Sequence, residues 1–240
     1  DFYNKRMWDV KEEDDTHVVF ALVSPDGDQG FPGEVKIEVS YTITEENELK
    51  IHYHAISDQD TLLNMTNHSY FNMDGHASGD VLDQEVWIDA DAFTRADAES
   101  IPTGEITPVE GTPMDFRKEK VVEKEIGADY TPLKLAGGYD HNWVIDDFDG
   151  SLKLFAEVRA PKSGRVLRAY TNLPGVQFYA GNFIDKQAGK NGVEYGPRSG
   201  LCLETQFYPD SANKPQFPSA IFGPDRIYDY TTVYEFLTDK

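Results

Sequence analysis

The chain has 240 residues, of which 39% are hydrophobic and 12% aromatic, and 22 Lys and Arg against 43 Asp and Glu give a formal net charge of −21. This apolar content supports a buried core and excludes a disordered chain. The negative charge repels polyanions and no apolar run reaches the roughly 20 residues of a membrane-spanning helix, so we expect neither nucleic acid nor a membrane as partner.

Alternation of apolar and polar residues dominates the chain. It begins at residues 17–23 and is clearest at 35–43, where Val, Ile and Tyr alternate with charged and hydroxyl-bearing residues. After the polar interruption at 45–47 the alternation resumes over 49–55, which predicts a hairpin with one buried face. Shorter runs of the same kind follow at 86–88, 152–158, 166–171, 176–179, 201–205 and 232–236.

Turn-forming pairs separate these runs. They are Asp26-Gly27, Pro32-Gly33, Asp74-Gly75, Asp149-Gly150, Ser163-Gly164, Pro174-Gly175 and Gly223-Pro224. Only Val121 to Ile126 indicates a helical turn or two. Many short strands joined by turns are typical of a sandwich or barrel. Since no repeat, linker or internal boundary is visible, we expect one all-β domain over residues 1–240.

A histidine lies in the unusual run 66–72, Thr-Asn-His-Ser-Tyr-Phe-Asn. In an extended segment His68 shares a face with Thr66, Tyr70 and Asn72, and the residues between them point the other way. This gives an imidazole on a polar, aromatic surface, which suits acid/base chemistry. The alternative is a structural histidine whose ring is satisfied by a backbone carbonyl or by Tyr70.

A glutamate follows the apolar run Leu201-Cys202-Leu203. Carboxylates are rarely buried unless they are paired or functional. Burial would raise the pKa of Glu204 towards neutrality and make it a competent general base. The alternative is a structural ion pair with an arginine such as Arg198 or Arg168.

Asp140 follows Gly137-Gly138-Tyr139, where a flexible backbone could present its carboxylate to the hydroxyl groups of a ligand. Capping of a loop is the alternative role. The neighbouring His141 is expected to point away from Asp140. Nearby aromatic residues could stack on a sugar, although the core is the simpler place for them: Tyr139, Trp143 and Phe178.

No metal site is expected. Cys202 is the only cysteine, so the chain has neither an intrachain disulfide nor a cysteine-based ligand set. His52 and His54 have a spacing that can bind Zn²⁺, but no third ligand is evident and a solvated strand face explains both.

Several segments resemble the signature segments of the aldose 1-epimerase (galactose mutarotase) family and occur in the family's order. They are 66–72, 138–142, 174–183, Leu203-Glu204-Thr205-Gln206, Pro209-Asp210 and 213–219, with further matches at 101–106 and 112–117. The resemblance covers the chain from about Trp8 to Phe236.

The resemblance implies a large antiparallel β-sandwich with an open sugar cleft, which interconverts the α and β anomers of free hexoses such as galactose or glucose. By this resemblance Glu204 aligns with the general base, His68 with the general acid, Asp140 with a carboxylate that holds sugar hydroxyls, and Gln177 with a further substrate contact. The chemistry needs one acid and one base, and we expect no cofactor and no metal.

Family members also carry a leading segment with an Asn-Arg pair and a Leu-His-Gly-Gly loop, and these 240 residues contain no counterpart of it. The arginine and histidine of that segment help to bind the sugar. We therefore expect the chain to be the larger, C-terminal part of a longer family member, with the leading segment absent or supplied as a separate piece. The chain alone is expected to have weak or no activity.

Two other functions stay open. One is a non-catalytic carbohydrate-binding β-sandwich that keeps the cleft without turnover. The other is a relative that epimerises a hexose phosphate, which the charge of −21 and the lack of a cluster of Arg and Lys beside the motifs disfavour.

Overall fold

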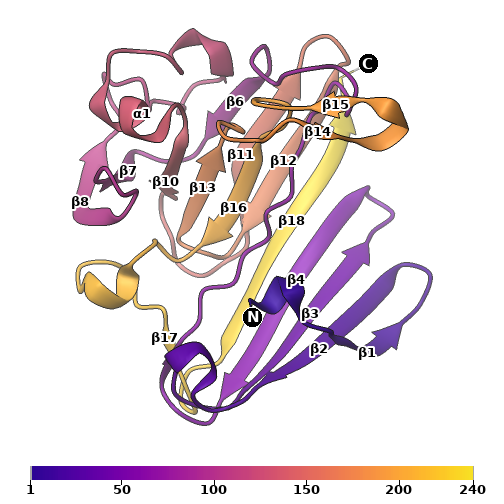
Figure 1. Ribbon diagram of the computed structural model, residues 1–240, viewed down its shortest axis with the longest axis vertical. Coiled ribbons are helices and arrows are strands. Elements are labelled where there is room, and N and C mark those ends of the chain that lie inside the picture. The colour runs from indigo at the N-terminus through magenta and orange to yellow at the C-terminus, as the bar shows by residue number, and fades with distance from the viewer. Residues whose placement is uncertain (1, 240) are drawn as a thin grey trace.

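The computed structural model describes residues 2–239 and consists mainly of β-strands (Figure 1). A nine-stranded sheet has the spatial order β1 (Asp9–Glu13), β2 (His17–Ser24), β3 (Val35–Ile43), β4 (Glu48–Ser57), β18 (Tyr228–Thr238), β12 (Arg165–Thr171), β11 (Lys153–Ala160), β6 (Glu85–Ile88), β9 (Lys120–Val121). A five-stranded sheet has the order β16 (Cys202–Gln206), β13 (Gly175–Tyr179), β10 (Asp140–Val144), β7 (Ala92–Ala96), β8 (Pro102–Pro108). All strand pairs described in both sheets are antiparallel, as predicted.

The predicted hairpin is the pair β3 and β4, in register from Val35 opposite Ser57 to Ile43 opposite Leu49. On β3 the apolar residues Val35, Ile37 and Val39 are buried, whereas their polar neighbours are partly or fully exposed. The turn passes through Asn47, which adopts a left-handed φ of 61° that asparagine tolerates better than most residues. The alternation in the sequence therefore sets both the strands and the buried face.

The two sheets pack face to face and form a β-sandwich. One hydrophobic cluster joins them, with Phe155 and Leu167 from the larger sheet and Trp143 and Phe178 from the smaller, all fully buried. Burial of each such aromatic or leucine side chain stabilises the fold by roughly 1.5–3 kcal/mol. The hydroxyl of Tyr234 on β18 also donates to the carbonyl of Leu203 on β16, at 2.7 Å across the layers. The predicted β-sandwich is confirmed.

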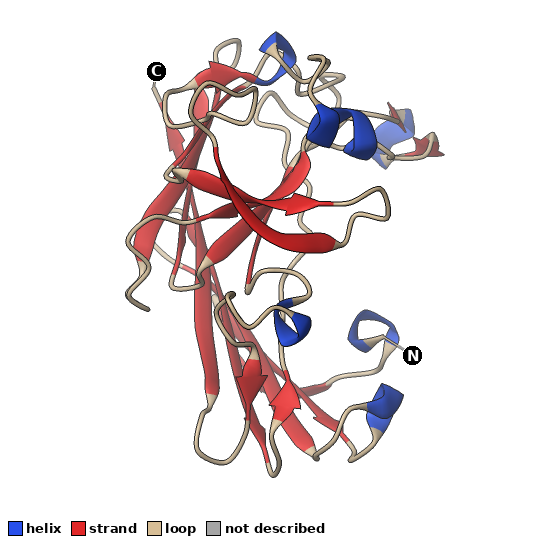
Figure 2. Ribbon diagram, turned by 90° about the vertical axis from the view of Figure 1, so that its left-hand side faces the viewer, coloured by secondary structure: helices blue, strands red, loops and turns tan. Residues whose placement is uncertain are grey.

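Strands β1 to β4 extend away from the smaller sheet (Figures 1 and 2). The N-terminal segment lies over this part of the sheet, where the guanidinium of Arg6 donates two hydrogen bonds to the carboxylate of Asp28, at 2.5 and 2.9 Å. The indole of Trp8 donates to the carbonyl of Tyr3 at 2.9 Å. Phe20 on β2 and Tyr41 on β3 stay partly exposed beneath this segment, so one face of β2 to β4 is only partly covered.

The remaining elements are short. One α-helix, α1 (Thr131–Ala136), was not predicted; Pro132 lies in its first turn, and Gly137 ends it with a φ of 65° just before β10. The predicted helical turn is the 3₁₀ helix Val122–Lys124. Two more strand pairs and four more 3₁₀ helices are described: β5 (Thr61–Leu62) with β17 (Ile221–Phe222), β14 (Gln187–Ala188) with β15 (Glu194–Tyr195), and Tyr3–Lys5, Asp28–Gly30, Lys190–Gly192 and Ser211–Asn213. Among residues 2–239, none of the helices is long and apolar enough to cross a bilayer.

Candidate active site

Three adjacent strands of the smaller sheet carry the polar residues of the site. Asn142 on β10 lies opposite Gln177 on β13, and Gln177 lies opposite Glu204 on β16. Since side chains alternate between the faces of a sheet, Asp140 shares the face of Asn142, and all of these groups lie together. The intervening residues point into the core, where Trp143, Phe178 and Leu203 are buried.

His68 reaches this face from a connecting segment. The segment makes a single β-bridge, between Phe71 and Leu201, and is otherwise unpaired. Its exposure still alternates as predicted, with Thr66, His68 and Tyr70 exposed. Because Phe71 is tied to Leu201, one residue before β16, the imidazole is held beside that strand.

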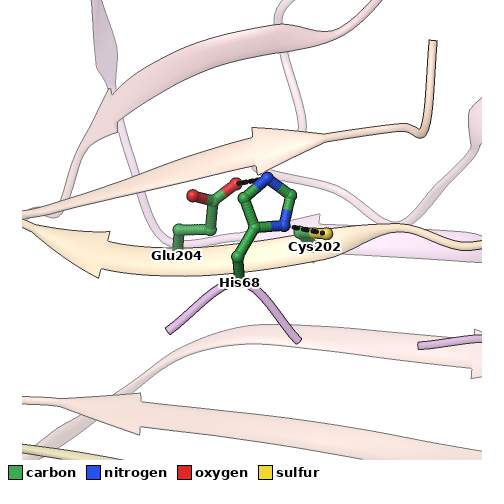
Figure 3. Close-up of side chains that lie close together, drawn as sticks. All are labelled: His68, Cys202 and Glu204. Atoms are coloured by element: carbon green, nitrogen blue, oxygen red, sulfur yellow. Dashed lines mark hydrogen bonds and ion pairs between the residues drawn. The ribbon is translucent and has the colours of Figure 1, made fainter. Parts of the chain in front are cut away.

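The imidazole lies between two side chains of β16 (Figure 3). Its Nε2 is 3.5 Å from Oε1 of Glu204, and its Nδ1 is 3.3 Å from Sγ of Cys202. The ring of Tyr70 stands 4.9 Å from that of His68 between centroids, and the ring of Tyr179 stands 5.9 Å from it. The alternative that His68 is satisfied by a backbone carbonyl or by the Tyr70 hydroxyl has no support among the hydrogen bonds of the described residues.

Glu204 is largely buried, and among residues 2–239 it forms no ion pair with an arginine. Its side chain is 12% exposed, and burial, with a smaller contribution from the charge of Asp140, raises its pKa to about 7. The two arginines that could have neutralised it bond elsewhere. Arg198 donates to Asn182 and to backbone carbonyls, and Arg168 donates to Glu157 at 2.8 Å. A carboxylate in this setting can accept a proton near neutral pH.

Asp140 and Gln177 are hydrogen-bonded to each other. The side-chain amide of Gln177 donates to Oδ1 of Asp140 at 2.7 Å, and the side-chain amide of Gln206 donates to Oε1 of Gln177 at 3.3 Å. Burial raises the pKa of Asp140, although the bond from Gln177 and the nearby His68 oppose the rise. The pair leaves lone pairs and an amide proton that can meet the hydroxyls of a polar ligand.

These side chains line a pocket of about 310 Å³. Its walls are His68, Tyr70, Asp140, Gln177, Tyr179, Glu204, Gln206 and Pro209. All four residues proposed from the sequence are therefore brought together. Tyr179 and Gln206 were missed as pocket residues; each lies two residues beyond a proposed one on the same strand, so the alternation of strand faces could have found both.

A larger groove of about 1230 Å³ begins at the same histidine and glutamate. It runs between the N-terminal segment and the partly covered face of β2 to β4, where its walls include Trp8, Phe20 and Tyr41. The groove is mostly apolar, and it meets the smaller pocket at His68 and Glu204.

The other sequence candidates are structural. His141 is buried on the opposite face from Asp140, and burial lowers its pKa to about 4. Tyr139, Trp143 and Phe178 are fully buried, so their assignment to the core is confirmed. His52 pairs with Asp229 at 2.7 Å on the surface of the larger sheet.

One cluster could be considered for a metal. Among residues 2–239, the donor atoms of His68, Cys202 and Glu204 lie within 4.8 Å of one another. However, Nδ1 faces the thiol and Nε2 faces the carboxylate, so neither ring nitrogen is directed at a point shared by both partners. This geometry fits a hydrogen-bonded chain better than a chelate, in which one nitrogen and the two other ligands would surround a single ion.

Fold and pocket together define a β-sandwich protein in which a histidine and a glutamate face each other in an open pocket. The family model described as aldose 1-epimerase matches residues 2–235. Galactose mutarotase of Mus musculus is 48% identical over 220 residues, and aldose 1-epimerase of Escherichia coli K12 is 37% identical over 239 residues. The chain belongs to the aldose 1-epimerase family.

The relatives are longer than this chain. The matched region is 91% of this chain but 62% of the mouse protein, and 99% of this chain but 68% of the Escherichia coli protein. The crystal structure of an aldose epimerase homologue from Caenorhabditis elegans matches with a TM-score of 0.84 and 31% identity, over 98% of this chain and 70% of the other. The chain therefore spans about three fifths of the mouse mutarotase's length.

Proposed function

We propose that this chain carries the acid/base apparatus of an aldose 1-epimerase, which interconverts the α and β anomers of free hexoses such as galactose or glucose. The observation that carries the proposal is the opposition of His68 Nε2 and Glu204 Oε1, 3.5 Å apart in an open pocket of about 310 Å³. That volume suits a small ligand such as one monosaccharide ring. Glu204 is the proposed base and His68 the proposed acid.

The spacing of the two groups suits the bond that must break. The ring oxygen and the anomeric hydroxyl are both attached to C1, so an acid and a base side by side can reach both. Glu204 takes the proton of the anomeric hydroxyl while His68 gives a proton to the ring oxygen, and the C1–O5 bond opens to leave an aldehyde. Each group could contribute roughly 10²–10⁴-fold.

The open-chain aldehyde then rotates about C1–C2 and closes from its other face. His68 takes back the proton from the O5 hydroxyl as O5 attacks C1, and Glu204 returns its proton to the new anomeric oxygen. Both side chains end as they began, so no cofactor or metal is consumed. Because the groups exchange roles, a glutamate pKa of about 7 suits the task at neutral pH.

Asp140 and Gln177 are proposed to bind the sugar hydroxyls. A carboxylate and an amide joined at 2.7 Å offer both acceptors and donors at fixed positions. They suit a sugar hydroxyl because a hydroxyl group both donates and accepts hydrogen bonds. A monosaccharide substrate is therefore the proposed partner of this pocket.

The apolar groove beside the pocket is the proposed binding surface for a segment that the complete protein needs for activity. Since the chain spans 62% of the mouse relative, we propose that residues 1–240 form a single sandwich domain within a longer protein. The additional segment of that protein covers the apolar groove and completes the sugar site at His68 and Glu204. The 240 residues alone are expected to show weak or no mutarotation. Polarimetry of freshly dissolved α-D-glucose measures this, and full-rate mutarotation by the chain alone would contradict it.

Among the alternatives, a hexose phosphate is disfavoured because the described residues that line the pocket include no Lys or Arg, and its walls carry Asp140 and Glu204. A non-catalytic sugar-binding protein makes a different prediction from an enzyme: sugar affinity survives Glu204→Gln and there is no rate to lose.

The discriminating experiment is NMR exchange between the anomeric C1 protons of galactose in the presence of the complete protein. Glu204→Gln should reduce the exchange rate by at least about 10²-fold. Glu157→Gln is the matched control, because Glu157 bonds to Arg159 and Arg168 on the larger sheet and does not line the pocket. Equal exchange in the wild type and Glu204→Gln would remove Glu204 from this role.

A further inference from the structure

Cys202 contacts the proposed acid directly. Its Sγ is 3.3 Å from Nδ1 of His68, within hydrogen-bond range for sulfur, and its side chain is fully buried, whereas that of His68 is 51% exposed. Cys202 and Glu204 are two residues apart on β16 and share its face, so the strand presents a thiol to one ring nitrogen and a carboxylate to the other (Figure 3). The ring is thus held at both nitrogens.

The thiol keeps its proton. Burial, with smaller contributions from the charges of Glu204 and Asp140, raises the pKa of Cys202 far above its ordinary value, so a thiolate is disfavoured. A neutral thiol is a weak donor and a weak acceptor. Because it carries a hydrogen that has no acceptor in the described structure other than Nδ1, donation of S–H to Nδ1 is the favourable arrangement.

The two neutral forms of the imidazole differ in how they meet these partners. With the proton on Nε2, the ring donates towards the carboxylate of Glu204 and its bare Nδ1 accepts from the thiol. With the proton on Nδ1, the bare Nε2 faces a carboxylate that is itself only an acceptor, and the thiol must accept instead of donate. The first form satisfies both contacts and the second satisfies neither well.

We propose that Cys202 is a positioning residue whose thiol keeps the proton of neutral His68 on Nε2, the nitrogen that faces the pocket. If His68 is the acid of the proposed epimerase, this places the proton where the ring oxygen of the sugar must receive it. Only that last step depends on the proposed function, since the site of the proton is a property of the chain itself.

The test is ¹⁵N NMR of the histidine side chains in this chain, at about pH 9, well above the ordinary imidazole pKa of about 6.5. Signals of His68 are assigned by their loss in His68→Asn. The nitrogen that couples strongly to both ring carbon protons is Nε2, and in the wild type it should have the shift of a protonated ring nitrogen. Nδ1, which couples strongly to one ring carbon proton only, should have the shift of a bare nitrogen.

In Cys202→Ala the ratio of the two tautomers should move by roughly threefold to fivefold towards Nδ1–H, the effect of losing one neutral hydrogen bond. Cys202→Ser, whose hydroxyl can donate to Nδ1, should restore the wild-type pattern. Cys202→Val removes the donor without leaving a cavity and repeats the test if the alanine variant is unstable. Wild-type tautomer populations in both Ala and Val variants would overturn the proposal, as would a wild-type His68 protonated at Nδ1.

A second measurement links the tautomer to activity. In the complete protein, Cys202→Ala should lower kcat for anomer exchange by about twofold to tenfold with little change in KM, and Cys202→Ser should recover most of it. A tautomer shift without any exchange activity in the wild type would reject the proposed function and keep the role of Cys202. No tautomer shift in an active protein would reject Cys202 and keep the function.

Discussion

Replacement of Glu204 by glutamine should stabilise the folded chain at alkaline pH. Burial raises the pKa of this carboxyl from 4.5 to about 7, so between these values the folded state holds a proton that the unfolded state has released. Stability therefore falls as pH rises through this range, since the unfolded state binds fewer protons. Glutamine keeps the size of the side chain and removes the ionisation.

The size of the effect follows from the two pKa values. With a pKa of about 7 in the folded state and 4.5 in the unfolded state, ionisation of Glu204 destabilises the folded chain by roughly 2–3 kcal/mol more at pH 8 than at pH 5. Relative to wild type, the free energy of unfolding of Glu204→Gln should therefore be larger at pH 8 than at pH 5, by roughly 2–3 kcal/mol. Titrations common to both proteins cancel in this comparison.

Urea unfolding of the 240-residue chain at the two pH values measures the difference and needs no activity. Glu157→Gln is the control of opposite sign. Partial burial of Glu157 alone would raise its pKa, but hydrogen bonds from Arg168 and Arg159 outweigh that and lower it. Its replacement should destabilise the chain at both pH values. If Glu204→Gln gave the same change at both pH values, the carboxyl would not be desolvated in the folded chain, and the argument for a base of raised pKa would be refuted.

Three further changes test other parts of the account. Asp140→Asn removes the nearby negative charge that helps to raise the pKa of Glu204, so ¹³C NMR titration should give a lower pKa for that carboxyl, and an unchanged value would show that burial acts alone. Gln177→Ala in the complete protein should raise KM for galactose by about fivefold through loss of one hydrogen-bonding group, with the strand residue Gln187→Ala as control, and equal KM values in both would exclude Gln177 from binding. Phe178→Ala should cost about 3–5 kcal/mol in urea unfolding because Phe178 is fully buried between the sheets, and a loss below about 1 kcal/mol would be inconsistent with that packing.

The sequence predicted the strands that bury one face and expose the other. At 35–43 one face meets the core and the other meets solvent, so alternation identifies the strand directly. Strand β7 was missed because Phe93 and Thr94 are both buried, which breaks the alternation. Strand β8 was missed because it begins and ends with proline and contains Gly104, residues that are tolerated there since β8 is the edge of its sheet.

The local sequence pattern could not predict which side chains meet at the site. His68 and Glu204 are 136 positions apart, and periodicity along either segment cannot say that they meet 3.5 Å apart. The resemblance to a family supplied that expectation. The contact between Cys202 and His68 had no signal at all, because a lone cysteine in an apolar run has the pattern of an ordinary core residue.

The pairing of His68 with Glu204 is tested most directly by the rate of anomeric exchange in the complete protein, measured for the wild type, His68→Asn, Glu204→Gln and the double variant. If the two side chains act as one acid/base unit, each single change removes most of the exchange and the double change removes little more. Wild-type exchange in either single variant, or losses in the two that multiply fully in the double variant, would contradict the account.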